Sequence, residues 1–258
     1  MNAMEAMDAC FAILPKVSCI LCAGYGDRFV GMAVECFLNQ DYQGELELVL
    51  VDNNDEPLDV SYLRDSLGSG FVYVRSKRLP VGALRNLGTQ HTTGEICVTW
   101  DEDDWYAPDR VSAQVKRLAD TGADVTGWHN VLYWDEANGR AFKYLYSPGY
   151  NHPPYAIGMS QCYRKDWWEK HPFPDAGIED LPFSKEAMHA RRLDSCDAGK
   201  LCVARIHDRN VCNKRSNHLG THKQWPEMER TALPEEFLIA IGEKEAASSI
   251  PQEAEQEQ

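Results

Sequence analysis

The sequence lacks a long apolar segment of the kind that crosses a membrane. It contains no run of about 18 consecutive apolar residues, which a spanning helix requires. Residues 1–15 hold neither lysine nor arginine, and acidic residues interrupt their apolar stretch, whereas a secretory leader has a basic start and a continuous apolar core. We therefore expect no membrane-spanning helix, no leader and a cytoplasmic location.

The sequence also lacks the cysteine spacing of a disulfide framework. Its nine cysteines are odd in number and irregularly spaced, which favours reduced thiols in a cytoplasmic protein. Cys19 and Cys22 form a C-x-x-C pair, but they fall inside an apolar run that predicts a buried strand. Burial therefore explains this pair better than redox chemistry.

Basic residues are in the minority. The chain has 26 Lys and Arg against 40 Asp and Glu, a formal net charge of −14, which excludes a general nucleic-acid coat or a membrane-surface protein. The exception is the segment 189–223, with eight basic and three acidic residues. It is either a solvated face or a surface for phosphates, on a donor diphosphate or on an anionic acceptor.

Hydrophobic residues make up 43% of the 258 residues, enough for one large α/β domain or two small ones. Strand-length apolar runs alternate with segments of helical periodicity. Strands are expected at 17–21, 46–51, 71–74 and 96–100, and helices at 29–38, 81–90 and 107–119. This alternation predicts βαβ units, and hence a mostly parallel mixed central sheet flanked by helices.

The second half of the chain is less regular. Strands are expected at 124–134 and 159–163, and helices at 165–170 and 179–190. From Glu243 onward the residues are mainly Glu, Gln, Ala and Ser, a composition that cannot bury a core and predicts disorder.

Polar clusters follow three of the first four expected strands, at 23–26, 52–55 and 101–104. The carboxyl ends of parallel strands meet at one edge of the sheet, and ligands bind at that edge. The three clusters therefore predict a ligand site there.

The densest of these clusters is Asp101-Glu-Asp-Asp104. Such closely spaced acids repel one another, and a hard divalent cation bound by carboxylate and phosphate oxygens would compensate them. The alternative is an acidic helix N-terminus ahead of the helix that Pro108 starts.

Several motifs in this order and spacing resemble the family 2 glycosyltransferases of the GT-A fold. They are Gly82-Ala-Leu-Arg-Asn-Leu-Gly88, Thr93-Gly-Glu-Ile96, Trp100-Asp-Glu-Asp-Asp104 with Pro108, Val51-Asp52, and Gly177-Ile-Glu-Asp180 with Pro182-Phe183. The resemblance extends from Val17 to Cys212. It implies one GT-A domain with a Rossmann-like nucleotide-binding half and an acceptor half.

The resemblance also sets the expected domain limits. Residues 1–15 would be an N-terminal extension, and 16–225 the GT-A domain, divided into a nucleotide-sugar-binding half (16–120) and an acceptor half (121–225). Residues 226–258 would form a C-terminal helix and an acidic disordered tail.

The resemblance implies a bound Mn²⁺ or Mg²⁺. Asp103 would be its ligand, Asp101 would contact the metal or the donor's ribose, and His207 would be a further ligand unless it is merely structural. The metal would neutralise the departing diphosphate.

The donor would be a nucleotide sugar, by resemblance a UDP-sugar. Asp52 would accept a hydrogen bond from the base, and Arg85 would face the nucleotide or its phosphates unless it is a surface helix residue. The floor and side of the nucleotide pocket would be formed by Ala23, Gly24 and Tyr25.

The catalytic pair implied by the resemblance is Glu179 and Asp180. Asp180 would be the general base that takes the acceptor's proton during an inverting displacement. The alternative for this pair is an N-terminal helix cap.

Departures from the family pattern leave the donor's base and sugar open. The first strand ends in Cys22-Ala-Gly-Tyr-Gly26 instead of a Thr-Tyr-Asn type motif, and the second in Asp52-Asn-Asn-Asp55 instead of Asp-Asp-Gly-Ser. The acceptor is also open: a glycan, a small molecule, or an anionic acceptor such as a modified nucleic acid.

Two other functions remain as alternatives. The glycine-rich segment 20–29 resembles the opening of sugar nucleotidyltransferases, but these need a nearby downstream lysine, and none occurs between Arg28 and Lys77. The chain could instead be a non-catalytic module that binds a nucleotide or a sugar, although its intact acidic motifs argue against this.

Overall fold

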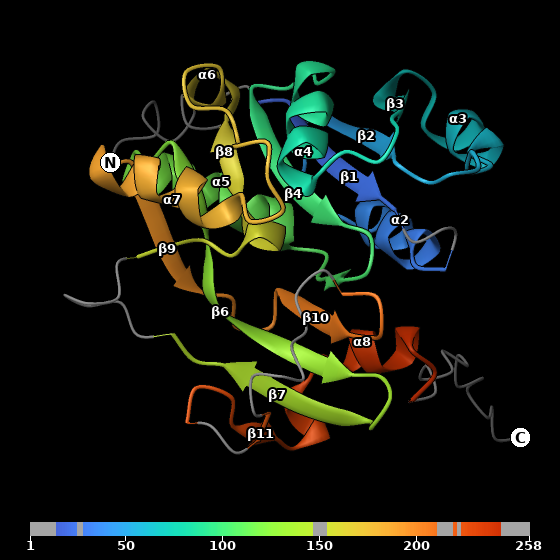
Figure 1. Ribbon diagram of the computed structural model, residues 1–258, viewed down its shortest axis with the longest axis vertical. Helices are drawn as coiled ribbons and strands as arrows, with labels where there is room; N and C mark the ends of the chain where they lie inside the picture. The colour runs from blue at the N-terminus through green and yellow to red at the C-terminus, as the bar shows by residue number, and fades with distance from the viewer. Residues whose placement is uncertain (1–13, 25–27, 147–153, 211–218, 221–222, 244–258) are drawn as a thin grey trace, which may run out of the picture.

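The computed structural model describes residues 14–24, 28–146, 154–210, 219–220 and 223–243. They form a curled mixed β-sheet with helices on both faces (Figure 1). The main strand order is β11-β7-β6-β8-β4-β1-β2-β3. The predicted fold class, a mixed α/β sheet flanked by helices, is confirmed.

The first half of the chain builds the parallel part of the sheet. Its strands are β1 (Val17–Ala23), β2 (Leu46–Asp52), β3 (Phe71–Arg75) and β4 (Ile96–Asp101). β1 pairs in parallel with β2 and β4, and β2 pairs in parallel with β3. Ala23 lies opposite Asp52, and Cys22 opposite Asp101, so the polar clusters meet at one edge as predicted.

Helices cover both faces of this sheet because successive strand residues point to opposite sides. The helices of the first half are α2 (Val30–Leu38), α3 (Ser61–Leu67), α4 (Val81–Gln90) and α5 (Arg110–Thr121), with a 3₁₀ turn at Gly68–Gly70. Cys19 and Leu21 belong to the apolar cluster under α2 and α5, whereas Ile20 belongs to the cluster under α4. The sequence pattern missed α3.

The second half contributes mixed pairings and one long strand. Its strands are β5 (Trp105–Tyr106), β6 (Val125–Asp135), β7 (Arg140–Tyr144), β8 (Cys162–Arg164), β9 (Leu193–Asp197), β10 (Cys202–Ile206) and β11 (Glu227–Met228). β6 pairs with β8 and β9 near its start and with β7 and β10 near its end. This one strand therefore connects the parallel part to the lower part of Figure 1.

The remaining helices are short. They are α6 (Lys165–Trp168), α7 (Asp180–His189), α8 (Glu235–Ala240) and 3₁₀ turns at Gly158–Ser160 and Arg230–Ala232. The predicted strand at 159–163 is wrong in its first half. Residues 158–160 form a 3₁₀ turn, whose backbone leaves Gly158 beside the site described below.

Most of the described cysteines and tryptophans belong to the core. Cys19 and Cys22 are free thiols; Cys19 is fully buried, which raises its pKa to about 12, whereas Cys22 is partly buried and lines the cavity described below. The six tryptophans between residues 100 and 168 are at most 8% exposed.

Within the described part of the chain, no helix combines the length and the apolar character that a membrane crossing demands. Most of the expected N-terminal extension and acidic tail lies outside the described residues. The domain limits given above stay predictions.

The close packing of α4 on β1 and β2 yields a stability prediction. A Cβ at Gly88 would lie 2.4 Å from Cγ2 of Ile20 and 3.0 Å from Cγ2 of Val51, two stiff β-branched side chains. We expect Gly88→Ala to lower the free energy of unfolding by about 1–3 kcal/mol, measured in urea. The matched control is Gly31→Ala in α2, where a Cβ meets nothing within 4 Å. Equal stability of the two variants would contradict this packing.

Candidate active site

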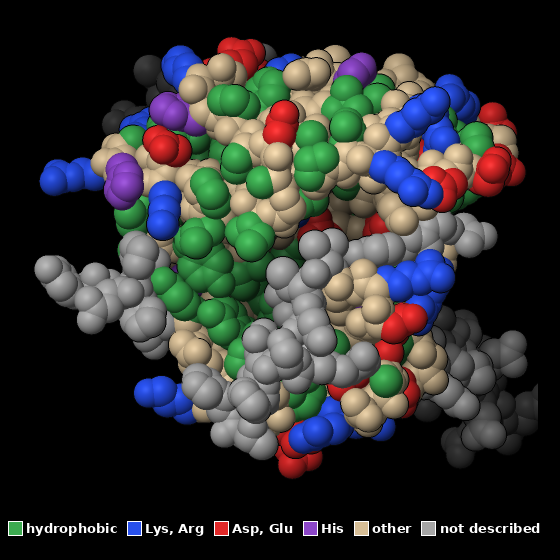
Figure 2. Space-filling model, viewed as in Figure 1, with side chains coloured by type: hydrophobic (Ala, Val, Ile, Leu, Met, Phe, Trp, Pro, Cys, Tyr) green, Lys and Arg blue, Asp and Glu red, His purple; other side chains and the backbone are tan. Residues whose placement is uncertain are grey.

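A cavity of about 370 Å³ opens at the carboxyl edge of the parallel strands. Its walls come from the ends of β1 and β4, the start of α4, the segment 177–180 and the end of β10. Figure 2 shows this hollow between the upper and lower parts of the molecule. Three of the sequence motifs therefore meet in one cavity.

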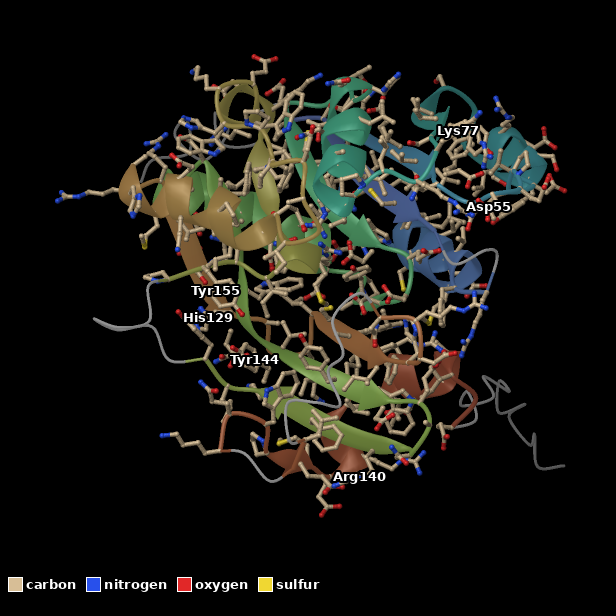
Figure 3. The ribbon with its side chains drawn as sticks, viewed as in Figure 1. Asp55, Lys77, His129, Arg140, Tyr144 and Tyr155 are labelled. Atoms are coloured by element: carbon tan, nitrogen blue, oxygen red, sulfur yellow. The ribbon has the colours of Figure 1, made fainter. Side chains whose placement is uncertain are left out.

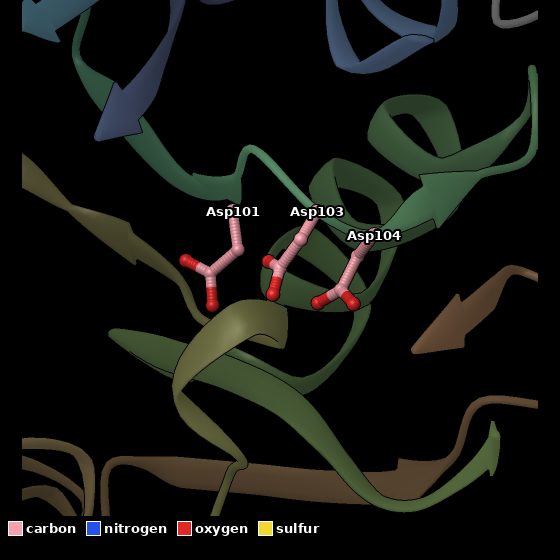
Figure 4. A group of neighbouring side chains, drawn as sticks. All are labelled: Asp101, Asp103 and Asp104. Carbon is pink, nitrogen blue, oxygen red and sulfur yellow. The ribbon is translucent and has the colours of Figure 1, made fainter. Parts of the chain in front are cut away.

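Three carboxylates gather where β4 ends. One side-chain oxygen each from Asp101, Asp103 and Asp104 lies within 4.8 Å of the other two, and the three side chains point to the same side (Figure 4). Asp101 is the last residue of β4, and the turn that follows the strand carries Asp103 and Asp104. Oxygen ligands so close together suit a hard divalent cation. Asp104 is the member to which the sequence assigned no ligand role.

His207 lies against this cluster, as predicted, next to Asp103. Its Nε2 is 2.8 Å from Oδ2 of Asp103, and the ring is almost fully buried next to Phe29. The backbone N–H of Arg209 donates to Nδ1 of His207 at 3.1 Å, and Nδ2 of Asn210 lies 3.1 Å from its Nε2. Asn210, which the sequence did not single out, also donates to Oδ2 of Asp103 at 3.2 Å. The role of His207 as a metal ligand stays a prediction.

Arg85 of α4 bridges two carboxylates from distant parts of the chain. Its Nη2 lies 3.0 Å from Oδ1 of Asp101, and its Nη1 donates to Oε1 of Glu179. Burial alone would lower the pKa of Arg85, but these two carboxylates outweigh it and raise the pKa. The residue is only 3% exposed, which rules out the alternative of a surface helix residue. Its charge is already shared between two partners, so the expected contact with the donor stays a prediction.

The two carboxylates of the Glu179–Asp180 pair have different surroundings. Glu179 is 4% exposed, and burial raises its pKa while Arg85 opposes that effect. Asp180, the first residue of α7, is half-buried and lines the cavity, and its Oδ2 accepts a hydrogen bond from the N–H of Gly158 at 3.1 Å. Gly158 fits tightly here, since a Cβ would lie 2.7 Å from Nη1 of Arg85. Only Asp180 therefore has the exposure that a base toward a substrate needs.

The wall at the end of β1 is formed by small residues. Ala23, Gly24 and Asn53 line the cavity there, and the N–H of Gly24 donates to Oε1 of Glu102 at 2.6 Å. Tyr25, expected in the same wall, lies outside the described residues. Ala23 and Gly24 therefore lie in the wall of the cavity, where they were expected. Their contact with a nucleotide stays a prediction.

Asp52 does not line the cavity. Its carboxylate is fully buried and accepts five hydrogen bonds, from Asn54 (N and Nδ2), Leu58, Tyr73 and Arg75, at 2.6–3.0 Å. Burial would raise the pKa of Asp52, but these hydrogen bonds outweigh it and lower the pKa. These hydrogen bonds make Asp52 an anchor for the loop after β2. To accept a hydrogen bond from the base of a nucleotide sugar, Asp52 would have to release one of its five present hydrogen bonds. Asn53 is the residue of this segment that reaches the cavity.

The charge of the cavity is strongly negative. Among the described residues, two guanidinium groups line it, those of Arg85 and Arg205, against the six carboxylates Asp101, Glu102, Asp103, Asp104, Glu179 and Asp180. An anionic phosphate can enter such a cavity only with a cation that screens these charges. No described residue of the lining is a lysine, which weakens the nucleotidyltransferase alternative further.

Solved structures with a similar fold are glycosyltransferases of the GT-A class. S. aureus TarS (residues 1–349) is 16% identical with a TM-score of 0.57, over 74% of this chain and 60% of that chain. The mannosyltransferase PcManGT from Pyrobaculum calidifontis, solved with GDP-Man and Mn²⁺, is 19% identical with a TM-score of 0.58, over 77% of this chain and 59% of that one. These likenesses show that the chain has a fold similar to that of GT-A glycosyltransferases.

The sequence identifies the family. The family model described as glycosyl transferase family 2 matches residues 27–173, more than half of the chain, and the chain belongs to this family. It is also 22% identical over 228 residues to the putative glycosyltransferase EpsH of Bacillus subtilis (strain 168). That match covers 80% of this chain but 65% of EpsH, so this chain spans about two-thirds or less of the relatives it matches.

The buried bridge made by Arg85 yields a second prediction. Arg85→Met would leave Glu179 buried without its cation, and we expect it to lower the free energy of unfolding by about 3–5 kcal/mol in urea. The matched control is Arg78→Ala, which removes an ion pair with Asp55 whose side chains are 80% and 71% exposed. That change should have little effect. A loss in Arg85→Met no larger than in Arg78→Ala would contradict the bridge.

Proposed function

We propose that the chain is a metal-dependent, inverting glycosyltransferase that transfers a hexose from a nucleotide sugar, a UDP-sugar, to an acceptor hydroxyl. One observation carries the proposal: a single cavity holds the carboxylates of Asp101, Asp103 and Asp104 on one side and Asp180 on the other. Membership of family 2 supports the reaction class.

Mn²⁺ or Mg²⁺ fits the first group of residues. Three carboxylates that converge within 4.8 Å offer the oxygen ligands that both ions accept, and the excess negative charge of the cavity requires a cation. Asp101, Asp103 and Asp104 would hold the ion, with His207 behind Asp103. The bound ion supplies the positive charge that stabilises the departing diphosphate.

Asp180 is the proposed general base. The acceptor's hydroxyl oxygen forms the new bond to the anomeric carbon while its proton passes to the Asp180 carboxylate. The bond from the anomeric carbon to the diphosphate oxygen breaks, and the diphosphate leaves with the electron pair. A single displacement of this kind inverts the anomeric configuration. The N–H of Gly158 orients the base, and Glu179 acts by fixing Arg85.

The donor would lie between the wall at Ala23, Gly24 and Asn53 and the acidic cluster. TarS has been solved with UDP-GlcNAc and PcManGT with GDP-Man and Mn²⁺, which supports a nucleoside diphosphate sugar with a metal. Asp52 would affect binding of the donor's nucleobase indirectly, through the loop after β2 that its hydrogen bonds hold in place.

The metal assignment predicts the behaviour of Asp103→Ala. Loss of one carboxylate of the group should abolish Mn²⁺-dependent binding of the nucleotide sugar, measured by calorimetry with UDP-GlcNAc, other UDP-sugars and GDP-Man. The control Asp65→Ala removes an exposed acid of α3 that does not line the cavity, and it should bind like the unmodified protein. Unchanged metal-dependent binding in Asp103→Ala would remove the assignment.

If Asp180 is the general base, its substitution should slow the reaction without weakening donor binding. Asp180→Asn keeps the shape of the side chain and an acceptor for Gly158, but it cannot take a proton. We expect unchanged donor binding and a fall in the rate of UDP release from the donor by about 10²–10⁴-fold. An equal loss of donor binding would show that Asp180 has a structural role instead.

A further inference from the structure

An aromatic strip lies beside the cavity on β6, β7 and the segments next to them. It consists of Tyr133, Tyr144, Tyr146, Tyr155 and Trp225. Trp225 contacts Tyr133 and Tyr144, with ring centroids 4.9 and 4.8 Å apart, and Tyr146 meets Tyr155 edge-on at 4.8 Å. The rings of Tyr144 and Tyr146, with centroids 6.5 Å apart, join the two groups.

The strip is continuous with the proposed catalytic cavity. Tyr133 itself lines that cavity together with Asp180. Tyr155 lies two residues before Ile157, another lining residue, and the charge of Asp180 contributes to the raised pKa of Tyr155, after burial and the two neighbouring tyrosines. A ligand on the strip would therefore reach the base.

Exposure increases along the strip away from the cavity. Tyr133 and Trp225 are 3% and 5% exposed, whereas Tyr144, Tyr146 and Tyr155 are half-buried, with part of each side chain open to solvent. Figure 3 shows Tyr144 and Tyr155 near His129, which lies 6.3 Å from Tyr146 between ring centroids. Figure 2 shows hydrophobic side chains gathered along the left side of the same hollow.

Among the described residues, the basic side chain next to Tyr144 on β7 is paired. Lys143, next to Tyr144, forms an ion pair of 2.8 Å with Asp197, which also accepts from Asn130. Two basic residues of the segment 189–223 are paired as well, Arg192 with Asp124 and Arg205 with Glu136. Lys143 is therefore not available as an unpaired cation for an anionic group at Tyr144.

We propose that the aromatic strip is the acceptor subsite and that it binds the neutral sugar rings of a glycan. This inference rests on the proposed function. The apolar C–H face of a pyranose packs on the face of an aromatic ring, and tyrosine adds a hydroxyl that can bond to sugar hydroxyls. His129, held by Ser195 at 2.8 Å, adds a polar group at the outer end. The glycan would lie along Tyr144, Tyr146 and Tyr155, whose rings are partly open to solvent, with the hydroxyl of its terminal sugar toward the cavity that Asp180 lines.

Saturation-transfer NMR on the full chain tests the proposal with defined probes. The neutral probes are cellotetraose, maltotetraose, chitotetraose and mannotetraose, and the anionic probe is a heparin tetrasaccharide. The variants are Tyr144→Ala and Tyr155→Ala, with Tyr144→Phe and Tyr155→Phe as conservative changes. Tyr62→Ala is the matched control, because Tyr62 is a 49% exposed tyrosine of α3.

We expect at least one neutral tetrasaccharide to bind. Its dissociation constant should rise about tenfold in each alanine variant, as for the loss of an aromatic anchor, and stay within about threefold in the phenylalanine variants. Tyr62→Ala should bind normally. The phenylalanine variants also show whether a loss reflects the ring or a failure to fold, which the melting temperature checks independently.

Three results would overturn the inference: no binding of any neutral tetrasaccharide, binding that both alanine variants retain, or preference for the heparin probe. Tyrosine-dependent binding to phosphatidylglycerol vesicles in place of the tetrasaccharides would assign the strip to lipid and also overturn it. Metal-dependent thermal shifts with nucleotide sugars keep the two claims separate. If those shifts are present and glycan binding fails, only the acceptor subsite is wrong; if they are absent, the proposed function fails.

Discussion

The site depends on one buried interaction, the double ion pair of the Arg85 guanidinium. It joins Asp101, at the end of a parallel strand, to Glu179, just before α7, and so fixes the acidic cluster relative to the proposed base. A buried cation between two carboxylates is stable only while both partners are present, because each lost partner leaves a charge without compensation. Gly158 is part of the same constraint, since any side chain there would push against Arg85.

The topology of the sheet explains why the cavity has two chemically different walls. The parallel strands β1 and β4 end at one edge and bring small residues and carboxylates there, where a nucleotide and a metal are proposed to bind. β6 continues past this edge into the second part of the sheet and carries Tyr133 to the opposite wall. The strand ends of the acidic wall and the strand that carries Tyr133 thus belong to one hydrogen-bonded sheet.

The first half of the fold could be predicted because its signals are local. β1, β2 and β4 are continuous apolar runs, and α4 has clear helical periodicity. β7 and β9 were missed because they are short, carry charged residues and exist through pairing with β6. In the site, the resemblance to the family motifs was enough to predict Arg85, Asp101 and Glu179 as site residues. The ion pair of Arg85 with Glu179 joins residues 94 positions apart, and the bond of Tyr73 to Asp52 joins residues 21 apart, so no local pattern encodes either.

The most direct test of the central claim is a thermal-shift measurement on the intact chain with UDP-sugars and GDP-Man, each with Mn²⁺ and with EDTA. A ligand that binds only the folded state raises the melting temperature according to its affinity. A metal-assisted donor site predicts a rise with at least one nucleotide sugar that EDTA abolishes. The same rise in EDTA, or no rise with any nucleotide sugar in the presence of Mn²⁺, would contradict it.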